Sequence, residues 1–348
     1  MSQSSEPSSN KSSRASWRAW IEEWLEHSSI GEAKDFLREL FYRLNNLGEA
    51  NFDVGKRMAD AGKHLDAIIR FHICLKFSPN HAQAHAMLAH CYVAKGQTTK
   101  ALKHLQQAIA LNPQDERCIY MLATLDSSLL AKELMPRTMP YEMMLEYFNN
   151  VAEQYEFMQQ SQQYRAHLYA DQALWDELDR RRRDYVVLEL GCGTGLCGQL
   201  LAEHTEDLVG VDFAHKMIDI ARMKRRPDGS RIYPSLVYQD IRNYFQDSPP
   251  EAYFDAVVAC HVLHYIGDIG SLFDGIVKVL KPEGIAVLQV ESYDKVDDFG
   301  LLKGKGRFGH GDGYMRHQCQ RVGLSVIAYH GIQVYPDYQM VQYVVRKL

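Results

Sequence analysis

Residues 186–198 could bind a nucleotide-type ligand. They read Val-Val-Leu-Glu-Leu-Gly-Cys-Gly-Thr-Gly-Leu-Cys-Gly, an apolar run with one acid and then four glycines. The run is typical of a buried strand, and the glycines are typical of a tight turn into a helix. Two alignments of the glycines are open. Gly193, Gly195 and Gly198 match the dinucleotide-binding spacing G-x-G-x-x-G, whereas the first three glycines with the preceding acid fit a different cofactor.

Acidic residues lie in or at the ends of three expected strands. Glu189 lies in the first strand, Asp212 ends the second 21 residues after Gly191, and Asp240 ends the third. In a parallel sheet, ligands bind at the carboxyl ends of the strands. Asp212 could accept hydrogen bonds from both ribose hydroxyls, and Asp240 could accept one from an adenine amino group, with the backbone of Ile241 reading the neighbouring ring nitrogen.

The charge of the acid before the glycines separates the two cofactors. A pyrophosphate beside Glu189 would place like charges together in a low-dielectric cleft, at a cost on the order of several kcal/mol. S-adenosylmethionine carries a sulfonium and an ammonium and no phosphate, so that acids around it are favourable. The turn Gly191–Gly195 then allows a close approach of backbone to ligand. One alternative stays open, in which Glu189 only braces the loop amides and either cofactor is tolerated.

Candidate catalytic groups follow the fourth expected strand and a later segment. Methyl transfer is an in-line displacement at the sulfonium methyl, so the protein must align the nucleophile and exclude water. His264 lies just past the fourth strand and is preferred to His261 as the base. His310 and Tyr314 belong to a late insertion expected to close over the substrate, and Arg307 could pair with a substrate carboxylate. The alternative for each residue is a packing or loop-bracing role.

The elements that must position these residues alternate along the chain. This alternation predicts an α/β fold with a doubly wound, mostly parallel sheet. Strands are expected at Val186–Leu190, Asp207–Val211, Ser235–Tyr238, Ala256–Cys260, Ile285–Val290, Leu324–Tyr329 and Met340–Arg346. Helices are expected at Tyr141–Met158, Ala166–Leu178, Leu196–His204, His215–Met223 and Ile269–Leu280.

A 34-residue period runs through the first third of the chain and indicates tetratricopeptide repeats, which are helix–turn–helix units. Pairs at this spacing include Gly62 and Gly96, Ala67 and Ala101, and Pro79 and Pro113. Residues 48–81 and 82–115 form two expected repeats, and residues 116–131 a third first-helix that caps the stack. Such stacks bind peptides or other subunits, so that a protein partner, self-association and a lid over the second domain all stay open.

Five segments carry a family resemblance. They are Glu-Leu-Gly-Cys-Gly-Thr-Gly, Gly-Val-Asp-Phe-Ala-His-Lys-Met-Ile-Asp-Ile-Ala-Arg, Gln-Asp-Ile, Phe-Asp-Ala-Val-Val-Ala-Cys-His-Val-Leu-His-Tyr-Ile-Gly-Asp and Leu-Lys-Pro-Glu-Gly. The chain resembles the class I S-adenosylmethionine-dependent methyltransferases, and more narrowly those with an N-terminal tetratricopeptide repeat region. The resemblance implies a Rossmann-like seven-stranded sheet in the order 3-2-1-4-5-7-6, with the last strand antiparallel. It also implies that a helix near Tyr155 covers the cofactor.

The expected cofactor is S-adenosylmethionine, and no metal is expected. Its expected binding residues are Glu189, Gly191, Cys192, Gly193, Gly195, Asp212, Phe213, Met217, Asp240, Ile241, Cys260 and Tyr155. The expected reaction is methyl transfer to an oxygen or nitrogen of a small molecule. Two alternatives remain: a protein methyltransferase whose repeats recruit the polypeptide, and a binding scaffold with an inactive cofactor domain.

The composition of the chain limits the kinds of partner that it is expected to bind. A formal net charge of −5 gives no general attraction to nucleic acid, and no apolar stretch is long enough to span a membrane. Seven cysteines, an odd number without a Cys-x-x-Cys pair, suit reduced thiols in a cytoplasmic protein. The expected domains are a disordered tail at 1–15, an all-α repeat domain at 16–135 and the methyltransferase domain at 141–348.

Overall fold

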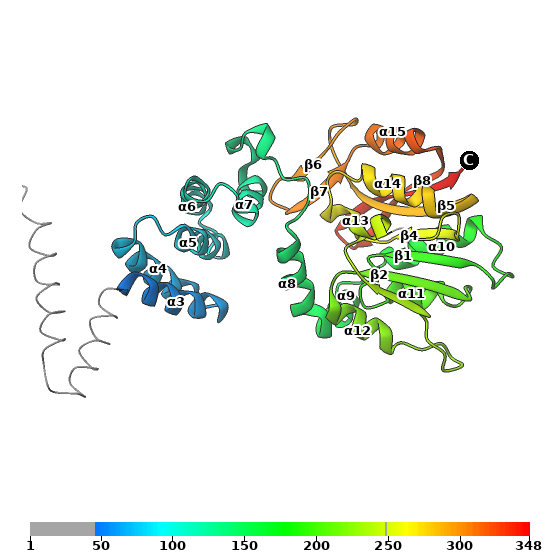
Figure 1. Ribbon diagram of the computed structural model, residues 1–348, viewed down its shortest axis with the longest axis horizontal. Helices are drawn as coiled ribbons and strands as arrows, with labels where there is room; N and C mark the ends of the chain where they lie inside the picture. The colour runs from blue at the N-terminus through cyan, green and yellow to red at the C-terminus, as the bar shows by residue number, and fades with distance from the viewer. Residues whose placement is uncertain (1–45, 248) are drawn as a thin grey trace, which may run out of the picture. The chain divides into compact units, whose positions relative to one another are not determined.

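The computed structural model describes residues 46–247 and 249–348. The expected tail at 1–15 therefore lies outside the described residues. The chain divides into two compact units, Met1–Gln114 and Asp115–Leu348, and each is described by itself (Figure 1). Within the described residues, no helix is both long and apolar enough to cross a bilayer.

The first unit contains two consecutive helix pairs, as the 34-residue period predicts. The helices are α3 (Leu47–Asp60), α4 (His64–Phe77), α5 (Ala82–Ala94) and α6 (Thr98–Leu111). Gly62 and Gly96, which follow α3 and α5, have φ values of +73° and +68°, a conformation that favours glycine at a helix end. Gly55 lets α3 approach α4 closely, because a Cβ there would lie 2.8 Å from the ring of Phe71.

Three side chains that can bind metals also meet in this unit. The ligand atoms of His64, His90 and Cys91 lie within 4.8 Å of one another. They come from two helices, so no spacing of cysteine and histidine in the sequence indicates the group. The group contains no fourth side-chain ligand among the described residues, and we report it as an observation only.

Helix α7 (Glu116–Asp126), expected to cap the repeat stack, belongs to the second compact unit. The hydroxyl of Tyr120 donates a hydrogen bond of 2.7 Å to the carbonyl of Gly306. The amide of Gly304 donates one of 2.9 Å to the carbonyl of Thr124. These bonds join α7 to Gly304 and Gly306 of the second unit, so the boundary between the compact units precedes α7. The expected division at 135–141 stays a prediction.

The second unit is built on one sheet. Its main strands are β1 (Val186–Leu190), β2 (Asp207–Asp212), β3 (Ser235–Tyr238), β4 (Phe254–Ala259), β5 (Leu280–Ser292), β8 (Leu324–Tyr335) and β9 (Tyr338–Lys347). They lie in the order β3-β2-β1-β4-β5-β9-β8, with the first five parallel and β9 antiparallel to β5. This is the strand order that the resemblance implies.

The sheet contains nine strands, two more than expected. A hairpin of β6 (Phe299–Leu302) and β7 (Arg307–His310) pairs with the end of β5 at Glu291 and Ser292. The hairpin segment is rich in glycine and lysine and lacks an apolar run. Strand periodicity therefore gives little signal there.

Helices cover both faces of the sheet. They are α8 (Tyr141–Val151), α9 (Tyr155–Ser161), α10 (Ala166–Glu177), α11 (Leu196–Leu201), α12 (His215–Met223), α13 (Ile241–Tyr244), α14 (Gly270–Val279) and α15 (Asp312–Val322). Five short 3₁₀ helices occur in the described residues, among them η3 (Ala152–Gln154) and η5 (Leu263–Tyr265). Neighbouring residues of β4 serve opposite faces: Val257 packs in the cluster of Phe273 from α14, and Val258 in the cluster of Leu174 from α10. The helix expected at Tyr141–Met158 is broken by η3, so that Tyr155 begins a separate helix.

Candidate functional site

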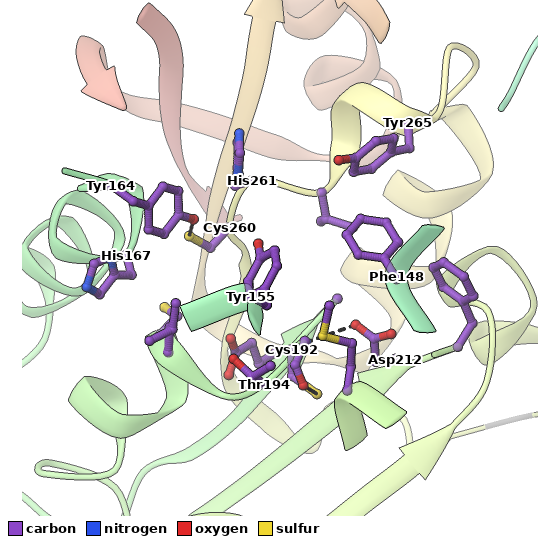
Figure 2. A pocket seen from close by; sticks show the side chains of 18 residues that line it. Phe148, Tyr155, Tyr164, His167, Cys192, Thr194, Asp212, Cys260, His261 and Tyr265 are labelled. Carbon is purple, nitrogen blue, oxygen red and sulfur yellow. Dashed lines mark hydrogen bonds between the residues drawn. The ribbon is translucent and has the colours of Figure 1, made fainter. Parts of the chain in front are cut away.

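A cavity that is open to solvent lies at the carboxyl ends of β1, β2 and β4 (Figure 2). Nine of the twelve residues expected to bind the cofactor line it. They are Tyr155, Glu189, Gly191, Cys192, Gly193, Asp212, Phe213, Met217 and Cys260.

The loop after β1 takes its shape from glycine. Gly191, Gly193 and Gly195 have φ values of +72°, +53° and +84°, which side chains other than glycine rarely adopt. A Cβ on Gly191 would lie 2.5 Å from Val262. A Cβ on Gly193 would meet no atom within 4 Å, so its backbone faces open space at the cavity wall. The loop therefore exposes main chain to a ligand.

Asp212 joins this loop to the end of β2. Its Oδ2 accepts a hydrogen bond of 2.9 Å from the amide of Gly193, and its Oδ1 accepts one of 2.8 Å from the amide of Ala214. Burial raises the pKa of Asp212 to about 6, while the amides act in the opposite direction. Each carboxylate oxygen keeps a further lone pair, so that the side chain can also accept hydrogen bonds from a ligand in the cavity.

Glu189 is a second buried carboxylate in the cavity wall. Its Oε2 accepts a hydrogen bond of 2.6 Å from the hydroxyl of Tyr233. Burial raises the pKa of Glu189 to about 8, and this hydrogen bond acts in the opposite direction. Among the described residues, the loop amide of Gly193 bonds to Asp212, and no loop amide bonds to Glu189. The alternative in which Glu189 only braces the loop is therefore not supported.

The charges of the cavity favour a cationic ligand over a phosphate. Glu189 and Asp212 both line it, and no lysine or arginine is among the described residues that line it. A pyrophosphate would meet two carboxylates without a compensating cation. The dinucleotide alignment of the glycines is thus disfavoured on geometry and charge together.

Comparisons with known proteins agree with this geometry. Residues 188–288 match the model of the methyltransferase domain family, and residues 58–125 match that of the tetratricopeptide repeat. The chain thus contains a methyltransferase domain, of the class that uses S-adenosylmethionine, and a tetratricopeptide repeat region. The cofactor expected from the resemblance is the one that this class of methyltransferase uses.

The relatives of the methyltransferase domain cover it in part. A Bacillus subtilis protein named as a methyltransferase, YqeM, is 31% identical over 114 residues, which are 32% of this chain and 44% of that protein. A ubiquinone biosynthesis O-methyltransferase of Idiomarina loihiensis is 31% identical over 99 residues, which are 28% of this chain and 39% of that protein. The chain thus spans less than half the length of these two relatives.

One solved structure is a 1,6-didemethyltoxoflavin-N1-methyltransferase of Burkholderia thailandensis. It is 16% identical at a TM-score of 0.48, and the match covers 61% of this chain and 92% of that one.

Three residues of the methyltransferase domain expected to touch the cofactor do not line the cavity. They are Gly195, Asp240 and Ile241. Gly195 precedes α11, the helix that begins at Leu196. The Asp240 carboxylate caps α13 by accepting the amide of Arg242 at 2.9 Å, and it also accepts from the Arg242 guanidinium. The adenine contact expected of Asp240 and Ile241 stays a prediction.

The four residues expected to be catalytic also lie outside the cavity wall. His264 is 0% exposed. His310 Nε2 lies 3.0 Å from the carbonyl oxygens of both Ile266 and Gly267. This geometry favours packing for His264 and bracing of the segment after η5 for His310, in place of the expected contact with substrate.

Tyr314 and Arg307 also interact with other residues of the protein. The hydroxyl of Tyr314 accepts a hydrogen bond of 3.1 Å from the amide of Ile269. Arg307 Nε lies 2.6 Å from Glu291 Oε1 on β5. Arg307 and Tyr314 lie outside the cavity wall because of the elements that hold them. The hairpin brings Arg307 to the end of β5, and α15 places Tyr314 against the start of α14. The expected carboxylate partner of Arg307 is thus a residue of the protein.

Sequence reasoning undervalued or missed several residues of the cavity wall. His261, two residues after the end of β4, lines the cavity, whereas the sequence favours His264 as the base. Phe148, Tyr164 and Tyr265 line it as well. The position of His261 near a strand end is a usable signal. No local pattern marks Tyr164, which lies two residues before α10 and reaches the cavity only through the tertiary fold.

Gly198, in helix α11, has a packing role that a substitution can test. A Cβ there would lie 2.0 Å from Tyr233 Oη and 2.9 Å from Glu189 Oε2, which identifies close packing of α11 as its role. We expect Gly198→Ala to lower the free energy of unfolding by about 1–3 kcal/mol, as overpacked cores do. Denaturant unfolding of the full chain measures this. Gly331→Ala is the matched control, because a Cβ there meets no atom within 4 Å. Equal stability of the two variants would contradict the assignment.

Proposed function

We propose that the chain transfers a methyl group from S-adenosylmethionine to an oxygen or nitrogen of a small molecule bound in this cavity. The proposal depends on one observation, which is that the two sides of the cavity differ in chemistry. Asp212, Cys192 and Thr194 lie on one side, and the rings of Tyr155, His261 and other aromatic residues lie on the other (Figure 2). One side suits a cationic cofactor, and the other offers a separate apolar space for an acceptor.

The proposed contacts with the cofactor follow from chemistry. Asp212 accepts hydrogen bonds from the ribose hydroxyls, and Glu189 pairs with the ammonium group of the methionine part. The glycine loop lets this part approach the main chain. Phe213 and Met217 offer apolar atoms to the flat base.

Bound S-adenosylmethionine supplies a methyl group on a positively charged sulfur, which is its chemical contribution. The protein's contribution is to hold the acceptor in line with that methyl group and to exclude water. Phe148 from α8 and Tyr155 from α9 lie over the cavity and can do both. These rings narrow the space beside the cofactor side of the cavity, which favours a small acceptor over a polypeptide. The Idiomarina relative, named for ubiquinone biosynthesis, also has a small-molecule role.

A second candidate is a protein methyltransferase. The match of residues 58–125 to tetratricopeptide repeats favours it, because such repeats bind polypeptides. In this case the repeats, as a proposed partner-binding or self-association region, recruit the substrate. The proposed domain division at 135–141 would then separate recruitment from chemistry.

One experiment separates these candidates. The full chain is incubated with methyl-labelled S-adenosylmethionine and a cell extract, and the labelled products are divided into small molecules and polypeptides. We expect label in a small molecule, identified by mass, and none with the Asp212→Ala variant. Label in polypeptides alone would support the second candidate. Binding of the cofactor without transfer would leave the scaffold alternative.

A further inference from the structure

The side of the cavity opposite Asp212 is an aromatic chamber, which we define as Tyr155, Tyr164, His261 and Tyr265 (Figure 2). His261 contributes the one imidazole ring of the chamber. The ring centroid lies 5.3 Å from that of Tyr164 and 5.9 Å from that of Tyr335. The chamber therefore presents flat aromatic surfaces together with the two imidazole nitrogens of His261.

His261 is held in an unusual backbone conformation. Its φ is +55°, in the left-handed region that residues other than glycine rarely adopt. Such strained positions persist where the surrounding structure enforces them, and they occur often at functional sites. The His261 Nε2 atom is buried and has no hydrogen-bond partner. Buried nitrogens without a partner are rare in proteins. His167, His264 and His310 also have such nitrogens, but of these four histidines only His167 and His261 line the cavity. The His261 Nε2 atom is therefore available to a ligand there.

A buried pair of glutamines holds His261 in place. Gln289 on β5 accepts a hydrogen bond of 3.1 Å from the amide of His261 through its Oε1. Its Nε2 donates to the carbonyl of Ala166 at 2.9 Å and to Gln342 Oε1 on β9 at 2.8 Å. Gln342 Nε2 donates in turn to the carbonyl of Tyr169 at 3.2 Å. Two strands and helix α10 thus position one backbone amide, and both glutamines are completely buried in the core.

The charges around the chamber disfavour an ammonium group. Arg307 acts on His261 as a positive charge. The nearby carboxylate of Glu291 is already engaged, with Arg307 Nε at 2.6 Å, Lys305 Nζ at 3.5 Å and a hydrogen bond from the hydroxyl of Tyr338. No carboxylate is among the four chamber residues. An aliphatic amine, charged at neutral pH, would therefore enter without a counter-ion.

We propose that the chamber binds a flat acceptor with an uncharged hydroxyl group and that His261 Nε2 takes the hydroxyl proton. This inference rests on the proposed function and narrows its acceptor to a hydroxyl compound in place of an aliphatic amine. The acceptor oxygen forms a bond to the methyl carbon, and the bond from sulfur to that carbon breaks with its electron pair left on sulfur. The hydroxyl proton passes to His261 and then to water.

The protonation state of His261 agrees with this role. Burial, together with Arg307, lowers the pKa of His261 to about 3, so that the ring is neutral from pH 5 to pH 9. The Nδ1–H tautomer then presents the Nε2 lone pair to the acceptor. An oxygen that gains a methyl group becomes positively charged and strongly acidic, and even this weak base removes its proton. A protonated aliphatic amine would keep its proton.

The first test measures binding without turnover. The full chain, loaded with S-adenosylhomocysteine, is titrated with phenol and with benzylamine, a hydroxyl and an ammonium probe of similar shape. Saturation-transfer NMR detects contact, and ¹⁵N NMR reports the His261 ring. We expect phenol to bind at least tenfold more tightly and to shift the His261 Nε2 signal. His261→Phe should abolish the preference, and His317→Phe, at an exposed helix position, is the control. Equal binding of the two probes would overturn the proposal.

The second test measures turnover with the acceptor found by labelling. We expect His261→Phe to lower kcat by about 100-fold and to leave the affinity for S-adenosylhomocysteine within twofold. A plot of the wild-type kcat against pH should show no change of slope near pH 6.5. The groups that surround the His261 ring are His264, Arg307, Tyr164, Tyr335 and Tyr338. A methylated aliphatic amine as the product, or unchanged kcat in His261→Phe, would overturn the inference and leave the proposed function intact.

Gln289 is a positioning residue in this scheme. We expect Gln289→Met to lower kcat at least fivefold, to alter the ¹⁵N signal of His261 and to leave the KM for S-adenosylmethionine unchanged. Gln339→Met, at an exposed position of β9, is the control. An unaltered His261 signal in Gln289→Met would refute the positioning role. Failure of the wild-type chain to bind S-adenosylmethionine at all is a different outcome, because it would remove the proposed function itself.

Discussion

Asp212→Ala is expected to weaken S-adenosylmethionine binding by at least 100-fold. The carboxylate both orders the glycine loop, through the amide of Gly193, and is proposed to accept the ribose hydroxyls. A hydrogen bond to a charged group contributes about 1.5–3 kcal/mol, and about 1.4 kcal/mol corresponds to a tenfold change in affinity. The loss of two such bonds therefore predicts about 100-fold or more. Calorimetric titration of the full chain measures it.

Asp240→Asn is the matched comparison for Asp212→Ala. The Asp240 carboxylate caps α13 and pairs with Arg242 and does not line the cavity. We expect the variant to lose stability and to keep its affinity for the cofactor within about threefold, since no hydrogen bond to the ligand is lost. An equal loss of affinity in both variants would restore the adenine contact that the sequence predicts for Asp240. Wild-type affinity in a folded Asp212→Ala variant would contradict the ribose contact.

Cofactor affinity is expected to rise by about 100-fold between pH 6 and pH 9, through Glu189. Burial raises the pKa of this group to about 8 in the empty cavity. The cationic cofactor favours the ionised carboxylate, so binding lowers the pKa and releases a proton. Below pH 8, each unit of pH then costs about tenfold in affinity. Asp212, with a pKa raised to about 6, adds a further loss below pH 6.

Titrations at several pH values, in buffers of different ionisation enthalpy, count the protons released. Glu189→Gln is the control, because it preserves the shape of the side chain and removes its ionisation. It should bind more weakly than the wild type at pH 9, and the part of the pH dependence due to Glu189 should disappear. The amino group of the cofactor titrates equally in both proteins. Identical pH dependence in wild type and variant would exclude Glu189 as the source.

The sequence by itself determined the main strands of the sheet and one side of the cavity. Apolar runs bounded by glycine or acidic residues are local signals, and the strands at Val186–Leu190 and Ser235–Tyr238 and the helix at His215–Met223 have the bounds expected from them. Parallel strands end at one edge, so Glu189 and Asp212 could be placed together before any coordinates were known. Their acidic character then favoured a cationic cofactor over a phosphate, because residue type is known from the sequence alone.

The tertiary structure alone decided the other side of the cavity. His261 and His264 both follow β4, and only the folded structure shows that His261, which has a positive φ, lines the cavity. The partners that set each role lie far away in sequence: Tyr233 is 44 residues from Glu189, and Gln289 is 28 residues from His261. Such contacts depend on packing between elements, which no local pattern encodes. The acceptor chamber is therefore a property of the fold, whereas the cofactor acids are already evident in the chain.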